Sequence, residues 1–316
     1  MFDVVALGEV LIDFTCVDTD AQGYPTLSAH PGGATANFLA ALAGLGAKTA
    51  HLGKVGNDAF GRLLLGTLEK AGINTKGMVI SDEVFTTLAF VTLDERGERD
   101  FSFARKPGAD TCIEFDELDL EIIDQAKVFH IGTLSLTDEP ARMATYRAVA
   151  YAKSKGKWIT CDPNLRKPLW KDLQDAKEQL LWALSQADVI KISDDEVRFL
   201  FDMTPEEGAA YIVGKFGVKL VFVTCGAEGC FYKNPMAEGR VAALRGVNVV
   251  DTTGAGDIFG GSAVYRLLRT GTDPDKLSGK QLDEIVKFAC IAASLSTTRP
   301  GGISSVPTID EIEKFL

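Results

Sequence analysis

Apolar strand-like runs alternate with helical patterns along most of the chain, and this alternation constrains the fold more than any other feature. "VVALG" at 4–8 precedes the helical stretch 36–46, and "KVFHIG" at 127–132 precedes the helical stretch 141–156. Repeated strand-then-helix units predict a parallel sheet with helices on both faces. We therefore expect an α/β fold built on a mostly parallel central sheet.

Two stretches interrupt this alternation. Residues about 10–30 and about 86–110 alternate as short strands with no helix between them. Asp94–Glu98 is typical of the polar loop of a β-hairpin. Short strands outside the main order predict a small β-sheet, which we interpret as a lid over a site. No internal repeat or low-complexity tract divides the chain, so we expect residues 1–316 to form one domain that carries this lid.

Composition and charge limit the class of protein and its partners. The 316 residues are 46% hydrophobic and 24% charged, which is typical of a globular chain with a sizeable core. The net charge of −11 disfavours binding to nucleic acid or to an anionic membrane. The amino terminus has no basic leader, and no apolar run is long enough to span a bilayer. We expect a cytoplasmic protein.

Cysteines and histidines give no pattern of a metal centre. The six cysteines are scattered without a CxxC pair, which is typical of reduced thiols and not of disulfides or a zinc site. Only His30, His51 and His130 are present, and we interpret each as structural.

The segment "DTTGAGD" at 251–257 carries the chemistry. We read 245–250 as a strand and the residues after Asp257 as a helix that ends near Gly271. A strand, a glycine turn and a helix together direct backbone N–H groups and a positive dipole end at an anion. A carboxylate would repel that anion. The arrangement makes sense if the anion is a phosphoryl group that is being transferred and Asp257 acts on the nucleophile that attacks it. The alternatives are a turn that only allows close packing, and a dinucleotide-binding turn, which the position of Asp257 disfavours.

Two long motifs together resemble the signatures of the pfkB family of ribokinase-type carbohydrate kinases. They are "DTTGAGD" and "PGGATANFLAALAGLGAKTAHLGKVGNDAFG" at 31–61, and the resemblance extends over essentially the whole chain. "GEVLIDF" and "DPNLRKPLW" are similar to segments of fructokinases in this family. In "FARKPGAD", Ala104 and Lys106 depart from the aromatic residue and the asparagine that are more common there. The resemblance implies a ribokinase-like fold and phosphorylation of D-fructose to fructose 6-phosphate, with ATP and Mg²⁺.

The resemblance also assigns roles to residues at the sugar. Asp257 would be the general base, and the backbone N–H groups of Gly254, Ala255 and Gly256 would hold the developing negative charge. Arg166 would share the charge of the transferred phosphoryl group. The residues implied to bind the sugar are Asp13, which ends the strand-like run "GEVLIDF", Gly32, Gly33, Asn37, Arg105 and Asp257.

A second set of residues is implied for the nucleotide and for metal ions. The nucleotide set is Asn164, Ser193, Thr224, Gly226, Gly229, Gly254 and Gly256. Glu196 would hold Mg²⁺ through water, although Ser193 and Glu196 also fit a capping box at the start of a helix. A potassium ion is implied near Asp251, Thr253, Ser296, Arg299, Gly301 and Ser305. The other interpretation is that Asp251 only caps its turn, and both stay open.

Three other functions stay in view, together with one partner. A kinase for 2-keto-3-deoxygluconate would use cations such as Arg105, Lys106 and Arg166 for the substrate carboxylate. A catalytically silent sugar- or nucleotide-binding regulator and a dehydrogenase are the other two, and the intact "DTTGAGD" segment disfavours both. The exposed strands of the lid predict a homodimer formed through it. The residues expected on its apolar face are Phe14, Phe90, Val91, Phe101 and Phe103.

Overall fold

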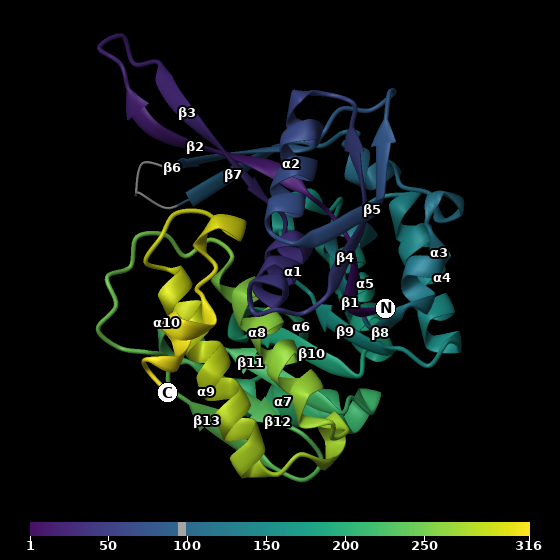
Figure 1. Cartoon of the computed structure of the whole chain (residues 1–316), viewed down its shortest axis with the longest axis vertical. Helices are drawn as coiled ribbons and strands as arrows, with labels where there is room; N and C mark the ends of the chain where they lie inside the picture. Colours follow the sequence, from purple (N-terminus) through teal and green to yellow (C-terminus); the bar gives the residue numbers. More distant parts are fainter. Residues whose placement is uncertain (94–98) are drawn as a thin grey trace.

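The larger of two sheets has nine strands and is mostly parallel, as predicted (Figure 1). The computed structural model describes residues 1–93 and 99–316, so the hairpin loop expected at Asp94–Glu98 lies outside the described residues. The strand order is β13-β12-β11-β10-β9-β8-β1-β4-β5, and only β12 and β13 pair antiparallel to their neighbours. The strands are β1 Phe2–Leu7, β4 Thr49–Gly56, β5 Ile73–Ser81, β8 Ala126–Gly132, β9 Trp158–Asp162, β10 Val189–Ser193, β11 Leu220–Thr224, β12 Cys230–Lys233 and β13 Glu238–Val241.

Helices cover both faces of this sheet (Figure 1). Along β1, Val5 and Leu7 enter one core cluster, whereas Val4 and Ala6 enter another on the opposite face. Strands buried on both faces have apolar residues at nearly every position, which explains their continuous apolar runs. The first cluster is covered by α3 Leu120–Asp124, α4 Ala141–Ser154, α5 Leu173–Gln186, α6 Asp194–Phe201 and α7 Pro205–Phe216. The opposite face is covered by α1 Ala34–Gly44, α2 Ala59–Lys70, α8 Ala255–Thr270, α9 Gly279–Ser296 and α10 Ile309–Glu313.

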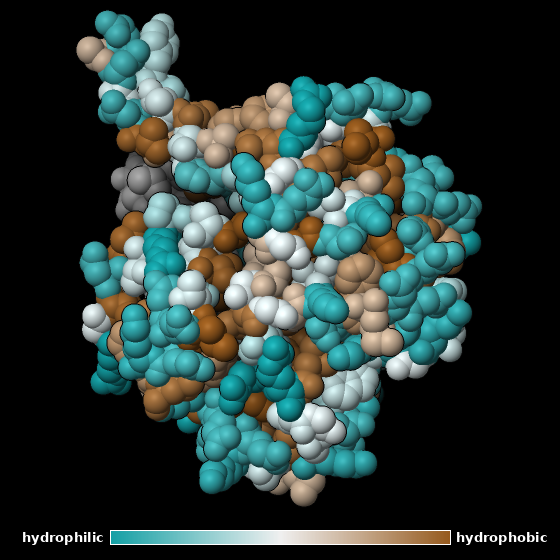
Figure 2. Space-filling view, viewed as in Figure 1, coloured by the Kyte–Doolittle hydropathy of each residue, from teal (hydrophilic) through white to brown (hydrophobic). Residues whose placement is uncertain are grey.

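The predicted small sheet is confirmed as a separate, four-stranded sheet in the order β3-β2-β6-β7. Its strands are β2 Leu11–Thr19, β3 Pro25–Gly32, β6 Leu88–Leu93 and β7 Arg99–Ala104. The hairpin of β2 and β3 projects from the body of the molecule, and its tip is mostly hydrophilic, with apolar residues gathered at its base (Figures 1 and 2). Asp13 lies within β2 and does not end a strand, because the chain continues extended into the projecting hairpin.

The alternation of side chains in the lid sheet contradicts the single apolar face that we expected. Asp13 pairs across the strands with Ala89, which pairs with Phe103, so these residues share one face, and Val91 follows on it. Phe14 and Phe90 point the other way, where their rings stack 5.3 Å apart, and Phe14 also packs against Phe60 of α2. One apolar surface therefore cannot contain all these side chains. The side chain of Phe101 lies outside the described part of the chain.

The prediction of a strand at 245–250 is wrong. After β13 the chain runs along the edge of the molecule without pairing to the sheet, and Val249 and Val250 are 58% and 57% exposed. The amides of Val250 and Asp251 donate instead to the carbonyl of Thr297, at 2.7 and 3.0 Å. The helix that follows, α8, ends at Gly271 as predicted, in a left-handed conformation.

Three smaller findings complete the fold. All six cysteines are free thiols, as their spacing predicted. Within residues 1–93 and 99–316, no helix is long and apolar enough to cross a membrane. His51 and His130 are buried, and each shares a 3.0 Å hydrogen bond with a threonine hydroxyl, of Thr35 and Thr160 respectively.

A buried carboxylate holds the start of α1. The residue before the helix, Gly33, has no side chain to cap it, and Glu9 Oε1 accepts the hydrogen bond of the Ala34 amide at 2.7 Å. Glu9 is only 1% exposed, and its Oε2 has no hydrogen-bond partner among the described residues. Burial raises the pKa of Glu9 to about 7, although the bonded N–H groups act to lower it. Ionised Glu9 therefore costs folding free energy.

We predict that Glu9→Gln reduces the dependence of stability on pH. Because the folded-state pKa of Glu9 lies above its ordinary value, folded wild-type protein holds a proton that the unfolded chain has lost, and stability falls as pH rises toward 7. The difference in unfolding free energy between pH 5 and pH 8 should shrink by roughly 3 kcal/mol in the variant. Thermal and urea unfolding measure it. Glu178→Gln, at an exposed glutamate of α5, is the control and should leave the difference unchanged; equal slopes for all three proteins would contradict the prediction.

Candidate active site

The carboxyl ends of adjacent parallel strands bring the predicted nucleotide residues to one edge of the sheet. Ser193 ends β10 and lies beside Thr224, which ends β11. Asp162 ends β9, the next strand, and Asn164 follows it in a left-handed conformation. Ligands of open α/β sheets bind in a crevice outside this edge.

Asp257 lies in the first turn of α8 and is tied to α1. Asn37 donates from Nδ2 to Asp257 Oδ2 at 2.8 Å, so two predicted site residues 220 positions apart are in direct contact. Asn37 Oδ1 is buried with no hydrogen-bond partner among the described residues. Gly254 precedes the helix with a φ of 76°, which favours glycine. The first amides of a helix have no partner within it. Here the Ala255 amide donates to the carbonyl of Thr252 at 3.3 Å, and the turn places its N–H groups beside a carboxylate.

Two charged residues that the sequence did not point out complete this part of the site. Lys191 Nζ lies 3.0 Å from Asp162 Oδ2, and both side chains are largely buried between β9, β10 and α8. A Cβ atom on Gly256 would lie 2.8 Å from Lys191 Nζ, so glycine at this position leaves room for the ammonium group. The signal was a lysine between Ile190 and Ile192 in a strand that is otherwise apolar.

The charges around Asp257 perturb it strongly. Burial raises its pKa to about 7, and the negative charge of Asp162 acts in the same direction. Lys191, the hydrogen bond from Asn37 and the charge of Arg166 all oppose this increase. Asp257 is consequently a much stronger proton acceptor than an exposed aspartate.

Asp13 brings the lid to the same site. Burial raises the pKa of Asp13 to about 6; the positive charge of Arg166 opposes this, and the negative charge of Asp251 adds to it. These mutual effects place the lid carboxylate within electrostatic reach of both residues. A Cβ atom on Gly32 would lie 2.7 Å from Asp13 Oδ2, so this glycine leaves room for the carboxylate. Gly33 follows directly and precedes α1, the helix that carries Asn37.

Arg105 is bound on every side by the protein. Its Nε donates to Asp110 Oδ2, Nη1 to Thr137 Oγ1 and Nη2 to the carbonyl of Leu134, each at 2.8 Å. It follows β7 directly and anchors the end of the lid to the core. Its predicted contact with the sugar stays a prediction, and these bonds give Arg105 a structural role as well.

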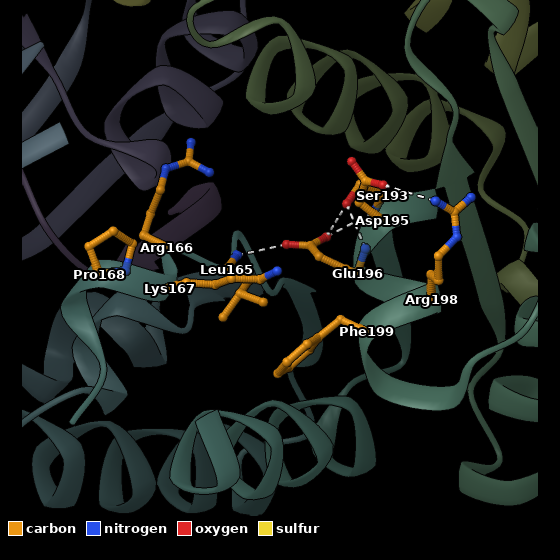
Figure 3. Close-up of a pocket in the computed structure, with 9 residues that line it drawn as sticks. All are labelled: Leu165, Arg166, Lys167, Pro168, Ser193, Asp195, Glu196, Arg198 and Phe199. Atoms are coloured by element: carbon orange, nitrogen blue, oxygen red, sulfur yellow. Dashed lines mark hydrogen bonds and ion pairs between the residues drawn. The ribbon is translucent and has the colours of Figure 1, made fainter. Parts of the chain in front are cut away.

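A cavity of about 640 Å³ opens beside the ends of β9 and β10 (Figure 3). Its lining residues are Leu165, Arg166, Lys167, Pro168, Ser193, Asp195, Glu196, Arg198 and Phe199. Three of them are cationic, which suits the phosphates of a nucleotide even though the protein carries a net charge of −11. Figure 3 shows Glu196 between Leu165 and Ser193, with Arg166 on the other side of the opening.

Glu196 forms the predicted capping box and one further bond. Its Oε2 accepts from the amide and hydroxyl of Ser193 at 2.8 and 2.9 Å, and Oε1 accepts from the amide of Leu165 at 2.7 Å. A carboxylate has about four lone-pair sites, so acceptor capacity remains toward the cavity. In the described part of the chain, no cluster of three or more His, Cys, Asp or Glu side chains could hold a metal directly. The donor set therefore fits Mg²⁺ held through water and phosphate oxygens.

The predicted nucleotide loop follows β11. The amide of Cys225 donates to the carbonyl of Gly229 at 2.8 Å and closes the turn. Gly226 and Gly229 both have positive φ angles, 52° and 94°. Thr224, at the end of the strand, thus leads into a short loop that faces the same edge as Ser193.

The candidate potassium residues are only partly brought together. Asp251 Oδ1 accepts from the amide and hydroxyl of Thr253 at 2.9 and 2.7 Å, and Asp251 Oδ2 accepts from the Gly301 amide at 2.8 Å. The hydroxyls of Ser296 and Ser305 donate instead to carbonyls of their own segments, at 2.8 and 2.9 Å. The side chain of Arg299 pairs with Glu311. A hydroxyl that donates its proton keeps its oxygen lone pairs, so these bonds leave the serine oxygens, Asp251 and the backbone carbonyls all available to an ion.

A half-buried carboxylate behind a glycine turn, at the edge of a parallel sheet and beside a cavity that carries three cationic side chains, fits the class of enzyme that transfers a phosphoryl group to a hydroxyl. Residues 1–309 match the pfkB family carbohydrate kinase model. The chain belongs to this family and is a sugar kinase.

Known fructokinases are similar to this chain over nearly their full length. Fructokinase-1 of Zea mays is 41% identical, over 99% of this chain and 97% of the relative. The structure of fructokinase with bound ATP from Xylella fastidiosa has a TM-score of 0.91 and 29% identity, and covers 100% of this chain and 98% of that chain. The structure of a fructokinase double mutant from Vibrio cholerae O395, with fructose, ADP and a potassium ion bound, has a TM-score of 0.88 and 32% identity. The match covers 100% of this chain and 98% of that chain.

Proposed function

We propose that this sugar kinase transfers the γ-phosphoryl group of ATP to the 6-hydroxyl of D-fructose, with Asp257 as general base. The observation that carries the proposal is the half-buried carboxylate of Asp257 in the first turn of α8, bonded to Asn37 and within electrostatic reach of Arg166. The maize and Vibrio relatives support fructose as the substrate.

In this mechanism Asp257 orients the primary hydroxyl of the sugar and takes its proton. The hydroxyl oxygen forms a bond to the γ-phosphorus while the bond from that phosphorus to the β-phosphate oxygen of ATP breaks. The amides of Gly254, Ala255 and Gly256 meet the developing negative charge, and Arg166 shares it. ADP leaves with the electrons of the broken bond.

Asp13 and the neighbouring turn would hold the sugar. A carboxylate accepts two hydroxyl hydrogen bonds. Asn37 lies beside Asp257 and would bond another hydroxyl of the sugar. We infer that residues 1–316 form one domain that includes the lid, since Asp13 comes from the lid and Asp257 from a helix that covers the larger sheet. Water excluded by the lid could not compete as a nucleophile.

Ser193, Thr224, Gly226, Gly229 and Asn164 would bind the nucleotide, with Glu196 near its metal. Mg²⁺ on the phosphates would neutralise charge in the transition state, and a family structure from E. coli contains ATP with Mg²⁺.

The burial of Arg105 weighs against 2-keto-3-deoxygluconate as the substrate. Arg105 is already paired with Asp110, and Lys106 is exposed beyond the end of β7. Of the three cations considered for the substrate carboxylate, only Arg166 remains at the site. A neutral sugar therefore suits it better.

A sugar panel with measurement of ADP release tests the proposal. Fructose should give a higher kcat/KM than ribose or 2-keto-3-deoxygluconate, and a preference for the keto-acid would overturn the choice of sugar.

Asp257→Asn should bind ATP and fructose nearly as tightly as wild type but lose about 10²–10⁴-fold in kcat, since a general base acts in the transition state. Near-normal turnover in that variant would contradict the role of Asp257.

We also propose a potassium ion beside the glycine turn, held by Asp251 and by backbone carbonyls around Thr253, Ser296, Arg299 and Gly301. A large, weakly hydrated cation there would fix the conformation of the amides that meet the phosphoryl group. Turnover should be higher in K⁺ than in Na⁺ or tetramethylammonium at equal ionic strength. Asp251→Asn should remove the difference while far-ultraviolet circular dichroism stays unchanged. Equal rates of the wild type in all three salts would rule the ion out.

We further propose a homodimer formed through the lid. The outer strands β3 and β7 leave edges that can pair, and Val17 and Tyr24 of the projecting hairpin are 61% and 70% exposed. Light scattering at micromolar concentration should give twice the monomer mass. The double variant Val17→Glu, Tyr24→Ser should be monomeric, whereas Met236→Glu, at an exposed residue between β12 and β13, should remain dimeric. A monomeric wild type would contradict the proposal.

A further inference from the structure

Two buried charges lie directly behind the proposed base. Asp162 and Lys191 come from the neighbouring parallel strands β9 and β10, and Lys191 Nζ lies 3.0 Å from Asp162 Oδ2. Ile190 and Ile192 point to the opposite face of the sheet, so Lys191 points toward α8, the helix that carries Asp257. Asp162 Oδ1 has no hydrogen-bond partner in the described residues.

The surroundings of this pair are nearly dry. A cavity of about 10 Å³ beside it is lined by Phe38, His130, Thr160, Cys161, Asp162, Val189, Lys191, Phe222, Gly260 and Val264. Such a volume holds at most one water molecule. The ring of Phe38 stacks on His130, with the centroids 3.7 Å apart, and closes the cavity on the α1 side. Charges in such surroundings interact far more strongly than at the surface.

Lys191 is also packed against the glycine turn. Its ammonium group occupies the space that a side chain at position 256 would need, one residue before Asp257. The pair thus presents a positive and a negative charge to the same carboxylate from beneath. The other groups that act on Asp257 are Asn37, from α1, and Arg166, which follows β9. Glu196, at the start of α6, acts on the pair itself.

We propose that Asp162 and Lys191 are positioning residues whose opposed charges set the pH range in which Asp257 is ready to accept the sugar proton. The inference rests on the proposed role of Asp257 as general base. Lys191 favours the carboxylate form of Asp257, and Asp162 favours the protonated form. Neither residue needs to touch the sugar or the nucleotide.

The two charges should shift the pH at which kcat/KM rises in opposite directions. The pKa of Asp257 is raised to about 7 by burial first and by Asp162 second, and Lys191 opposes the increase. A base must be deprotonated, so kcat/KM for fructose should rise with pH through about 7 in the wild type. Removing the negative charge of Asp162 should move this rise to lower pH. Removing the positive charge of Lys191 should move it to higher pH.

The experiment compares pH profiles of kcat/KM for the wild type, Asp162→Asn, Lys191→Met and the double variant. The single variants should shift the rise by roughly one pH unit or more in opposite directions, as expected for a charge that acts directly on a neighbouring carboxylate. The double variant should return toward the wild-type position, and it also removes the unpaired buried charge that could unfold Lys191→Met. Shifts in the same direction, or none, would overturn the proposal.

Lys219→Met is the matched control. Lys219 precedes β11 at the opposite edge of the sheet and pairs with Asp188 and Asp273, so its loss should leave the profile unchanged. A shift in this control equal to that of Lys191→Met would show an effect of general charge and overturn the proposal.

A readout that does not depend on activity separates this inference from the proposed function. Infrared difference spectra of wild type against Asp257→Asn, recorded over a pH series, follow the protonated carboxyl of Asp257 directly. The same opposite shifts should be found in Asp162→Asn and Lys191→Met backgrounds. If fructose is not phosphorylated, the proposed function fails, yet these spectral shifts still test the pair. If fructose is phosphorylated and neither profile nor spectrum shifts, the pair has no such role.

Discussion

The hydrogen bond between Asn37 and Asp257 is the contact on which the rest of the site depends. It joins α1 and α8, two helices far apart in the sequence that pack on the same face of the sheet. Burying a carboxylate is costly unless it is bonded or balanced by charge. Here the balance comes from Asn37, Lys191 and Arg166, each supplied by a different element. α1 in turn starts at the turn that Glu9 caps, directly after the lid strand β3, so the lid, this turn and Asp257 are held in one arrangement.

The fold followed from the sequence where periodicity alone decides the structure. Strands such as β8 and β10 are buried on both faces, and their short apolar runs between helical patterns leave little ambiguity. The segment 245–250 carries three valines, but no strand of the described residues pairs with it, and the amide of Val250 bonds to the carbonyl of Thr297 after α9 instead. A strand depends on a partner, and the partner is not visible in a local pattern. The two faces of the lid were misjudged for a similar reason, because register decides which side each phenylalanine occupies.

The site was predictable where motifs carry it and unpredictable where neighbouring strands create it. The glycine turn, Asp257 and Asn37 come from two long motifs, and the structure places them in contact. Asp162 and Lys191 are 29 positions apart and meet only because β9 and β10 are adjacent. Arg105 was predicted to contact the substrate, and nothing in the sequence indicates that Asp110, five residues later, pairs with it. Which buried charges pair therefore depends on the tertiary fold. Each pairing changes the pKa values of the two groups and the contacts that they can make.

Two glycines of the motifs have a second explanation, which is the space that charged side chains of the site need. Glycine-rich turns are commonly explained by the close approach of a ligand to the backbone. In this protein Gly32 leaves room for the carboxylate of Asp13, and Gly256 leaves room for the ammonium group of Lys191. A methyl group at either position would have to displace a buried charged group, and the electrostatics of the site would change with the shape. The same small residues therefore fix both the shape of the turn and the positions of the charges around Asp257.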